Sequence, residues 1–198
     1  MSSSARRGLD VVGAFVGLLV LSPLLFLIAG FVGITLGRPI LFRQVRPGLG
    51  ARPFTMYKFR TMRNPAGGEE APVHDEERMT RAGRLLRQWS LDELPQLLNV
   101  LQGTMSLVGP RPLLMEYLPH YSARQRRRHE VKPGLTGWSQ VRGRNELSWP
   151  ERLELDVWYV EHQSIWLDLR ILLLTILVVA RRRGVTQPGR ATVDPFHG

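Results

Sequence analysis

The feature that most constrains this chain is an uncharged, strongly apolar run near its N-terminus. From Val11 to Leu36 there is no charged residue, and most positions are Val, Leu, Ile, Phe, Gly or Ala. At about 26 residues, the run exceeds the length that a helix needs to cross the apolar core of a bilayer. A cleaved signal peptide would have a shorter apolar region and a small-residue cleavage site, whereas this run leads into Gly37-Arg38-Pro39. We therefore expect a retained membrane segment.

A Ser22-Pro23 pair lies near the middle of this run. Proline removes an amide donor and clashes with the carbonyl four residues earlier, and serine can bond to a freed carbonyl, so we expect a bend. Each arm would be roughly 18 Å long, close to one leaflet of the apolar core. Basic residues flank both ends of the run without a clear excess on either side: Arg6, Arg7, Arg38, Arg43 and Arg46. The residues alone leave open a hairpin with both ends on the cytoplasmic face and a kinked single-pass anchor.

The composition limits the kinds of chemistry that the rest of the chain can carry out. At 198 residues, the chain has room for one domain with a core of its own. It contains no cysteine, which excludes a disulfide framework, a thiol nucleophile and cysteine-bound metal centres. The five histidines are dispersed and form no metal-binding pattern. The net charge of +10 favours a partner rich in phosphate, and nucleic acid, anionic lipid and a nucleotide substrate all fit that description.

Turn and periodicity signals divide the part that follows the apolar run. Strand-like pieces at Ile40-Leu41-Phe42 and Phe54-Thr55-Met56-Tyr57 flank a Gly-rich turn and predict a hairpin. A polar stretch from Asn64 to Val73 predicts a loop, and residues 76–89 and 94–101 predict two helices. We expect an α/β domain of mainly helical character.

A second apolar segment, Leu169 to Ala180, is too short to span a bilayer. Charged residues bound it and two tryptophans precede it, a pattern typical of a helix in the membrane interface, although a core helix fits nearly as well. The Arg124–Arg128 cluster predicts a solvated face that can also contact lipid phosphate. We expect residues 1–38 to form the membrane region, residues 39–184 the catalytic domain and residues 185–198 a polar tail.

Two adjacent acids, Asp92 and Glu93, are the strongest candidates for chemistry. Ser90 and Glu93 have the spacing of a helix capping box, which would give both acids a structural role. The acids are accompanied, however, by basic residues that can hold a diphosphate: Lys58, Arg60, Arg84, Arg87 and Arg111. In phosphoryl transfer, one carboxylate can attack phosphorus while its neighbour helps to hold a divalent cation. No P-loop motif is present in the sequence.

Five segments, in this order, resemble the bacterial sugar transferases, also called monotopic phosphoglycosyl transferases: Pro39–Gln44, Tyr57–Met62, Ser90–Asn99, Ser106–Leu113 and Lys132–Arg144. In that family the apolar N-terminal segment is a re-entrant helix-break-helix with a Ser-Pro pair at the bend, which Ser22-Pro23 resembles. The resemblance therefore favours the hairpin. It also implies a compact cytoplasmic catalytic domain with interfacial amphipathic helices, at the bacterial inner membrane.

The resemblance implies a reaction and residue roles. Asp92 would attack the β-phosphate of a UDP-sugar, release UMP and carry the phosphosugar until polyprenyl (undecaprenyl) phosphate collects it. Asp92 and Glu93 would hold Mg²⁺. Phosphate binding maps to Lys58, Arg87 and Arg111, and the substrate-binding set also includes Arg60, Gln140 and Arg142. The reaction would be the first membrane step of a bacterial glycan pathway, such as exopolysaccharide, O-antigen, capsule or glycoprotein.

The expected partners are a UDP-sugar, polyprenyl phosphate and membrane lipids, with no nucleic acid. The sequence leaves open the sugar and the oligomeric state, including a homodimer. Two rival hypotheses also stay open. In one, the lipid phosphate attacks the donor directly, without a covalent intermediate. In the other, the chain is a basic membrane-anchored binding protein whose acids only cap a helix.

Overall fold

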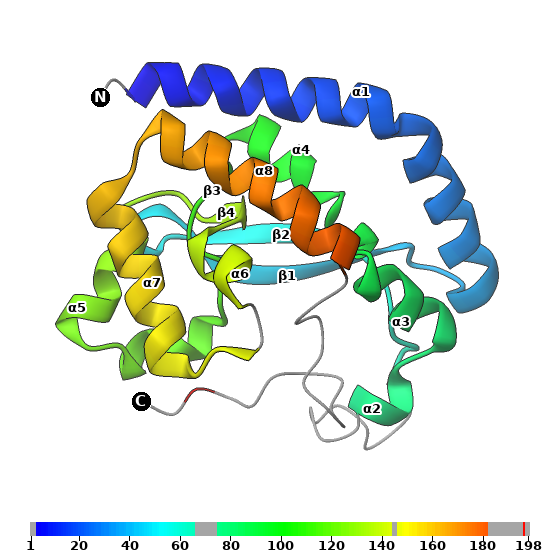
Figure 1. Ribbon diagram of the computed structural model, residues 1–198. Coiled ribbons are helices and arrows are strands. Elements are labelled where there is room, and N and C mark those ends of the chain that lie inside the picture. Colours follow the sequence, from blue (N-terminus) through cyan, green and yellow to red (C-terminus); the bar gives the residue numbers. More distant parts are fainter. Residues whose placement is uncertain (1–2, 66–74, 144–145, 182–195, 197–198) are drawn as a thin grey trace.

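The computed structural model describes residues 3–65, 75–143, 146–181 and 196. Helices surround two small sheets (Figure 1). Strands β1 (Leu41–Pro47) and β2 (Pro53–Phe59) form an antiparallel hairpin, and β3 (Ser106–Val108) pairs in parallel with β4 (Gly134–Thr136). The α-helices are α1 (Ser3–Leu36), α2 (Asp75–Arg78), α3 (Arg81–Gln88), α4 (Gln96–Gln102), α5 (Ala123–Arg126), α6 (Trp138–Arg142), α7 (Trp149–His162) and α8 (Ile165–Arg181). Short 3-10 helices are η1 (Leu49–Ala51), η3 (Leu91–Glu93), η4 (Met115–His120) and η5 (Arg127–His129). The expectation of a mainly helical fold with small sheets is confirmed.

The segments around the hairpin show where local sequence signals succeed and fail. The predicted hairpin is confirmed, with η1 in its turn. The prediction of one helix over residues 76–89 is wrong, because α2 and α3 are separate. Met79 between them pairs with Met62 as a β-bridge, and Thr80 caps α3 by accepting a hydrogen bond from the Gly83 amide at 3.0 Å. Most of the predicted loop from 64 to 73 lies outside the described residues.

Helix α1 contains Pro23 and remains helical through it. Pro23 has no amide hydrogen to donate to the carbonyl of Leu19, and the Ser22 hydroxyl donates to that carbonyl instead, at 2.8 Å. Figure 1 shows that α1 runs straight over the top of the molecule and then bends downward. The expected bend is therefore present, and it divides the helix into a first and a second arm.

The start of α1 is fixed to the rest of the protein by three charged side chains. Arg6 donates to Asp168 of α8 through Nε at 2.9 Å, and Arg7 bonds to two carbonyl groups at the end of α4. The buried Asp10 carboxylate accepts hydrogen bonds from the Ser106 hydroxyl and the Leu107 amide, both at 2.8 Å. The first arm of α1 is thus part of the same core as β3 and α8.

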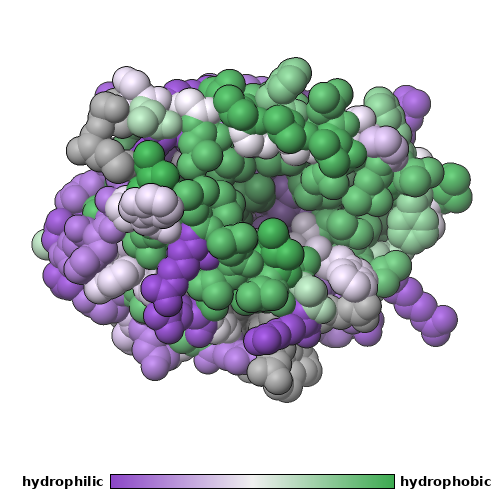
Figure 2. Space-filling model, turned by 45° about the horizontal axis from the view of Figure 1, so that its top comes forward, coloured by the Kyte–Doolittle hydropathy of each residue, from purple (hydrophilic) through white to green (hydrophobic). Residues whose placement is uncertain are grey.

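One face of the molecule is strongly apolar. Figure 2 shows apolar side chains gathered on the face that carries α1 and α8. The exposed apolar side chains include Val12, Phe15, Leu19, Val20, Phe26, Leu27 and Ile34 on α1, and Trp166, Leu173, Ile176 and Leu177 on α8. Helix α1 is long and apolar enough to cross a membrane, and only 11% of its most apolar window is buried. Apolar side chains left in contact with solvent on this scale mark a membrane or protein contact.

Helix α8 has features of both alternatives that its sequence left open, a helix in the membrane interface and a core helix. Ile171 and Asp168 are buried against the core, while Leu173, Ile176 and Leu177 face outward. The helix begins at Ile165, four residues before the apolar segment that predicted it. It is therefore a core helix on one side and part of the apolar face on the other.

Apolar clusters hold the elements together. The largest joins α1, α4, β3, α6 and α8, and a second joins the second arm of α1 to β2 and α3 through Val32, Phe59 and Leu86. A third cluster contains Phe196, which is only 6% exposed and packs against Tyr117 and Tyr121 of the η4 region. Phe196 is the described residue of the expected polar tail, and residues 185–195, 197 and 198 lie outside the described part.

Candidate active site

The two acids lie on η3, directly after α3. Ser90, between the two helices, adopts a left-handed conformation with φ of 55° and makes no side-chain capping bond. The predicted capping box is therefore wrong, because the Glu93 side chain turns instead to Lys58 and Arg111. A positive φ at a residue other than glycine is uncommon and is found at constrained turns, so the chain reverses sharply just before the acids.

Glu93 is clamped by two cations. Lys58 Nζ donates to Oε1 at 2.8 Å, Arg111 Nη1 donates to Oε2 at 3.1 Å, and Arg111 Nη2 also donates to Oε1. Burial alone would raise the pKa of Glu93, but the charges and hydrogen bonds of Arg111 and Lys58 outweigh it and hold that pKa well below its ordinary value. Glu93 is therefore ionised at neutral pH and fixed in place.

Asp92 differs from its neighbour. It is 6% exposed, and within the described residues its carboxylate forms no hydrogen bond or ion pair. Burial raises its pKa, and the negative charge of Glu93 acts in the same direction, while Lys58, Arg87 and Arg111 oppose the shift. The two adjacent carboxylates thus have different environments: cations hold the Glu93 carboxylate in place, whereas the Asp92 carboxylate has no hydrogen-bond partner among the described residues.

The cations around the acids come from separate parts of the chain. Lys58 lies on β2, which Asn99 of α4 holds by accepting from the Tyr57 amide at 3.1 Å and donating to the Thr55 carbonyl at 2.7 Å. Burial lowers the pKa of Lys58, and Glu93 counteracts this effect. Arg87 lies on α3 and donates to Thr61 Oγ1 at 3.1 Å, and burial lowers its pKa. The structure therefore brings together Lys58, Arg87, Arg111 and both acids, as the sequence predicted.

A buried ion pair between Arg128 and Asp156 contacts the backbone of Arg111. Arg128 Nη2 donates to the backbone carbonyl of Arg111 at 2.6 Å and to Asp156 Oδ2 at 2.7 Å. Asp156 also accepts from the Ser139 hydroxyl at 2.7 Å, and the side chains of Arg128 and Asp156 are both 1% exposed. Sequence reasoning missed this pair because Arg128 is part of a basic cluster that looked solvated. The helical spacing of Asp156 among apolar residues of α7 was the available signal.

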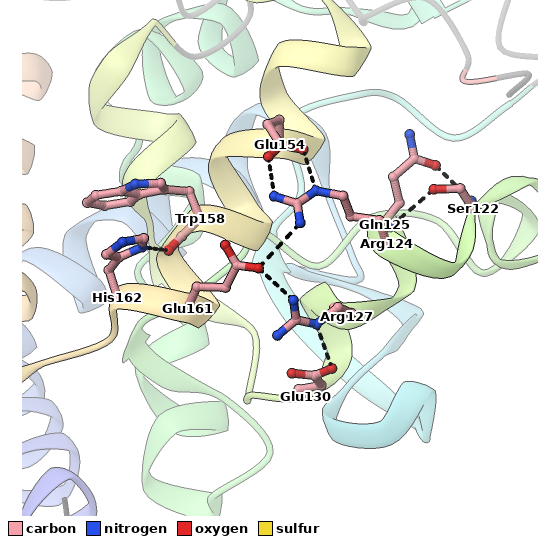
Figure 3. A network of polar contacts seen from close by, with 9 residues as sticks. All are labelled: Ser122, Arg124, Gln125, Arg127, Glu130, Glu154, Trp158, Glu161 and His162. Atoms are coloured by element: carbon pink, nitrogen blue, oxygen red, sulfur yellow. Dashed lines mark hydrogen bonds and ion pairs between the residues drawn. The ribbon is translucent and has the colours of Figure 1, made fainter.

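The rest of that basic cluster is a solvated face, as expected. Arg124 binds Glu154 and Arg127 binds Glu161 and Glu130, all on the surface (Figure 3). The same view shows that these arginines point to the carboxylates of α7 and of Glu130. Contact of this face with lipid phosphate stays a prediction.

Three predicted site residues lie apart from the acids. Arg60 is 6% exposed and donates to the carbonyls of Leu36, Gly37 and Arg38 at the end of α1, and to Asn64. Gln140 donates to the Leu135 carbonyl at 3.3 Å, and the Arg142 guanidinium lies 4.2 Å from the centre of the Trp138 ring. None of the three is among the charged groups that act on Asp92 or Glu93, so their roles in substrate binding stay predictions.

The acids fit a magnesium ion in part. An ionised carboxylate offers about four lone-pair sites, and the three hydrogen bonds to Glu93 leave room for one more ligand bond. Asp92 has both oxygens available. No group of three or more acid or histidine ligands occurs among the described residues. Mg²⁺ is commonly held by one or two carboxylates together with substrate phosphates, so this pair suits an ion that arrives with its substrate.

Two neighbouring carboxylates among partly buried cations have the composition of a phosphate-transfer site. The family model for bacterial sugar transferases matches residues 1–182. The chain is 50% identical over 193 residues to the uncharacterized sugar transferase EpsL of Bacillus subtilis, which covers 98% of this chain and 96% of that protein. This chain therefore belongs to the bacterial sugar transferase family.

Other relatives have names that state a reaction. The chain is 44% identical over 182 residues to the UDP-glucose:undecaprenyl-phosphate glucose-1-phosphate transferase of Caulobacter vibrioides, over 86% of this chain and 68% of that protein. It is 41% identical over 184 residues to the Escherichia coli protein of the same name, again over 86% of this chain, but over 39% of that longer protein. The chain is thus an enzyme of the transferase class that includes these phosphate-group transferases.

Proposed function

We propose that this protein transfers a sugar 1-phosphate from a UDP-sugar to polyprenyl phosphate, with release of UMP, through a covalent intermediate on Asp92. The observation that carries the proposal is the contrast within the acidic pair. Glu93 accepts three hydrogen bonds from Lys58 and Arg111, whereas the Asp92 carboxylate is buried beside the same cations without a hydrogen bond among the described residues. A nucleophile needs a free electron pair in a site where positive charge awaits phosphate.

The first step forms a bond between an Asp92 oxygen and the β-phosphorus of the donor. The bond between that phosphorus and the bridging oxygen breaks, and its electron pair leaves with UMP. Lys58 and Arg111 lie where they can balance the charge on the phosphate oxygens, and Arg87 adds a third cation on the α3 side. In the second step an oxygen of the lipid phosphate attacks the same phosphorus, and Asp92 regains its carboxylate.

We expect Asp92 and Glu93 to hold Mg²⁺ together with the donor diphosphate. When bound, the ion would neutralise phosphate charge and favour departure of UMP. Binding of the ion in the absence of donor should be weak, because the described part of the chain offers only two acidic ligands there. Titration of Mg²⁺ by calorimetry, with and without a UDP-sugar, measures this linkage.

The apolar face supports a place at the cytoplasmic surface of the inner membrane. In the proposed arrangement, α1 enters the bilayer as a re-entrant hairpin that bends at Ser22-Pro23, while α8 lies in the interface with its apolar side outward. A soluble nucleotide donor and a lipid acceptor can meet only at such a surface. The reaction would supply the first lipid-linked sugar of a glycan pathway.

The chemistry is tested by incubating the purified protein with Mg²⁺ and a panel of UDP-sugars, without lipid acceptor. We expect UMP release and an intact-mass increase of one phosphosugar for the wild type, and neither for Asp92→Asn. Glu154→Gln, which changes an exposed acid of the surface network, serves as the matched control and should retain both. Absence of an adduct together with UMP release only after polyprenyl phosphate is added would favour direct transfer. If neither an adduct nor UMP is detected with or without the lipid acceptor, the binding-protein hypothesis is favoured.

The membrane arrangement is tested with single cysteines, since the chain has none of its own. Ser4→Cys and Arg52→Cys place one thiol before and one after the apolar run, both at exposed positions. A re-entrant hairpin predicts that an impermeant maleimide labels neither thiol in intact spheroplasts and both after the membrane is opened. Labelling of one thiol in intact spheroplasts would instead show a single-pass anchor.

A further inference from the structure

A pocket of about 740 Å³ lies where α1 ends and the β1–β2 hairpin begins. Among the residues that line it are three arginines and two large apolar side chains: Arg38, Arg43, Arg60, Ile40 and Phe42. No lining residue is acidic. The volume is in the range of pockets that bind small molecules, and its lining combines positive charge with apolar surface. Such a lining suits a ligand that has an anionic head and a hydrocarbon tail.

Arg60 gives this pocket an unsatisfied donor. Its terminal nitrogens donate to Gly37 O at 2.7 Å and to Asn64 Oδ1 at 2.8 Å, but its buried Nε has no partner among the described residues. The side chain is 6% exposed, so water does not freely solvate it. A buried N–H without an acceptor is costly, and a phosphate oxygen in the pocket would satisfy it.

The other two arginines add charge that the protein does not neutralise. Within the described residues neither Arg38 nor Arg43 forms an ion pair with a carboxylate. Arg43 lies 5.9 Å from the centre of the Tyr57 ring, which orients it without cancelling its charge. The pocket is therefore cationic, with no acid lining it.

The strand register connects the pocket to the acidic pair. Phe42 is directly opposite Lys58 in the antiparallel hairpin, so their side chains lie on the same face of it. Arg60 directly follows the end of β2, two residues beyond Lys58, and its amide donates to the Ile40 carbonyl at 2.9 Å. Lys58 in turn binds Glu93 at 2.8 Å. The pocket and Lys58 are therefore linked through neighbouring positions of the hairpin, with the pocket on the α1 side.

The pocket also has apolar side chains around it on the α1 side. Phe42 is 45% exposed, and Ile34 near the end of α1 is 88% exposed. Ile40 belongs to the apolar cluster that contains the second arm of α1. A hydrocarbon chain that leaves the pocket can therefore follow this arm into the bilayer.

We propose that this pocket binds the phosphate of the polyprenyl phosphate acceptor, with its isoprenoid chain along the second arm of α1. The proposal rests on the proposed function and assigns its second substrate a site. An oxygen of the bound phosphate forms the new bond to the phosphorus on Asp92, and the bond from that phosphorus to the Asp92 oxygen breaks. The aspartate leaves as a carboxylate, and the product is the lipid diphosphate sugar.

The test separates the two half-reactions. Full-length wild type is compared with the Arg38→Ala/Arg43→Ala double variant, with Arg60→Lys, and with Arg52→Ala, an exposed arginine at the opposite end of the same hairpin. We expect the double variant to raise the KM for undecaprenyl phosphate at least about tenfold, because two charge-assisted contacts are lost. Arg60→Lys keeps the charge but removes the Nε donor and should raise the same KM. UMP release without acceptor should stay near the wild-type rate in the double variant, and Arg52→Ala should change neither quantity.

An unchanged KM for the acceptor in the double variant would overturn the proposal, as would an equal loss in the donor half-reaction. Competition identifies the ligand: polyprenol without phosphate, inorganic phosphate and phosphatidylglycerol vesicles should each compete poorly. Equal competition by phosphatidylglycerol would instead show a general headgroup site. If the wild type releases no UMP with any donor, the proposed function fails. Direct binding of a short-chain polyprenyl phosphate, present in wild type and lost in the double variant, would still support the pocket, and absence of binding would refute it.

Discussion

Replacing Arg128 with Met would leave a buried carboxylate without its counter-charge. Arg128 and Asp156 are both 1% exposed and are joined at 2.7 Å and 3.2 Å, so neither charge has water to replace its partner. The substitution also removes the donor to the Arg111 carbonyl, at 2.6 Å. Among the described residues, only the Ser139 hydroxyl would remain as a side-chain donor to Asp156.

The size of the effect follows from this burial. Removal of one partner from a buried ion pair costs about 3–5 kcal/mol of stability, because the remaining charge stays desolvated. Replacement of both partners by apolar residues of similar size is often nearly neutral. We therefore expect Arg128→Met to lower the free energy of unfolding by about 3–5 kcal/mol, and the double variant with Asp156→Leu to recover most of that loss.

In this series of variants, activity and stability should respond differently. The double variant regains stability but still lacks the bond to Arg111, so its kcat for UMP release should stay below that of the wild type. Chemical unfolding in detergent measures stability, and UMP release measures activity. Arg124→Ala, at an exposed arginine of the surface network in Figure 3, is the control and should change neither quantity measurably. A loss of stability in the double variant equal to that in Arg128→Met would refute the reasoning.

Three further predictions concern stability. Burial lowers the pKa of His129 to about 4, so the folded protein takes up this proton only well below the ordinary pKa of 6.5. The free energy of unfolding should therefore fall by up to about 3 kcal/mol as the pH drops from 7 toward 4, and His129→Gln should flatten that dependence in a series of unfolding measurements. Phe196→Ala should lower the free energy of unfolding by about 3–5 kcal/mol, and an unchanged unfolding curve would show that its aromatic contacts do not form in solution. A Cβ on Gly83 would lie 1.8 Å from the Thr61 carbonyl oxygen, so Gly83→Ala should cost about 1–3 kcal/mol, whereas Gly8→Ala, which meets no atom within 4 Å, should not destabilise.

Local signals in the sequence were reliable where the local chain decides the outcome. The Ser22-Pro23 bend follows from a missing amide hydrogen and a hydroxyl beside it, and both act within one helical turn. The hairpin follows from strand pieces on either side of a short turn. Helix α3 ends near its predicted boundary, but its start was missed, because a β-bridge from Met79 to the distant Met62 breaks the helix there.

The candidate site could be predicted only in part. The adjacent acids and the basic motifs identified Asp92, Glu93, Lys58, Arg87 and Arg111, which the structure brings together. The residues alone did not distinguish the two acids, and only the family resemblance named Asp92 as the nucleophile. The capping-box spacing of Ser90 and Glu93 is present, but the structure does not use it. Whether Glu93 caps the helix or binds cations depends on Lys58 and Arg111, which contact Glu93 from distant parts of the chain.

By itself, the sequence determined the features that depend on composition and short spacing: the apolar run with its bend, the mainly helical fold with a hairpin, the absence of thiol chemistry and the family. Tertiary structure decided which charges are buried and with which partners. It placed Arg128 inside while Arg124 stayed in solvent, although the two are only four positions apart in one basic cluster. The physical reason is that burial and pairing energies depend on residues far away in the chain, such as Asp156, whose position only the folded backbone defines.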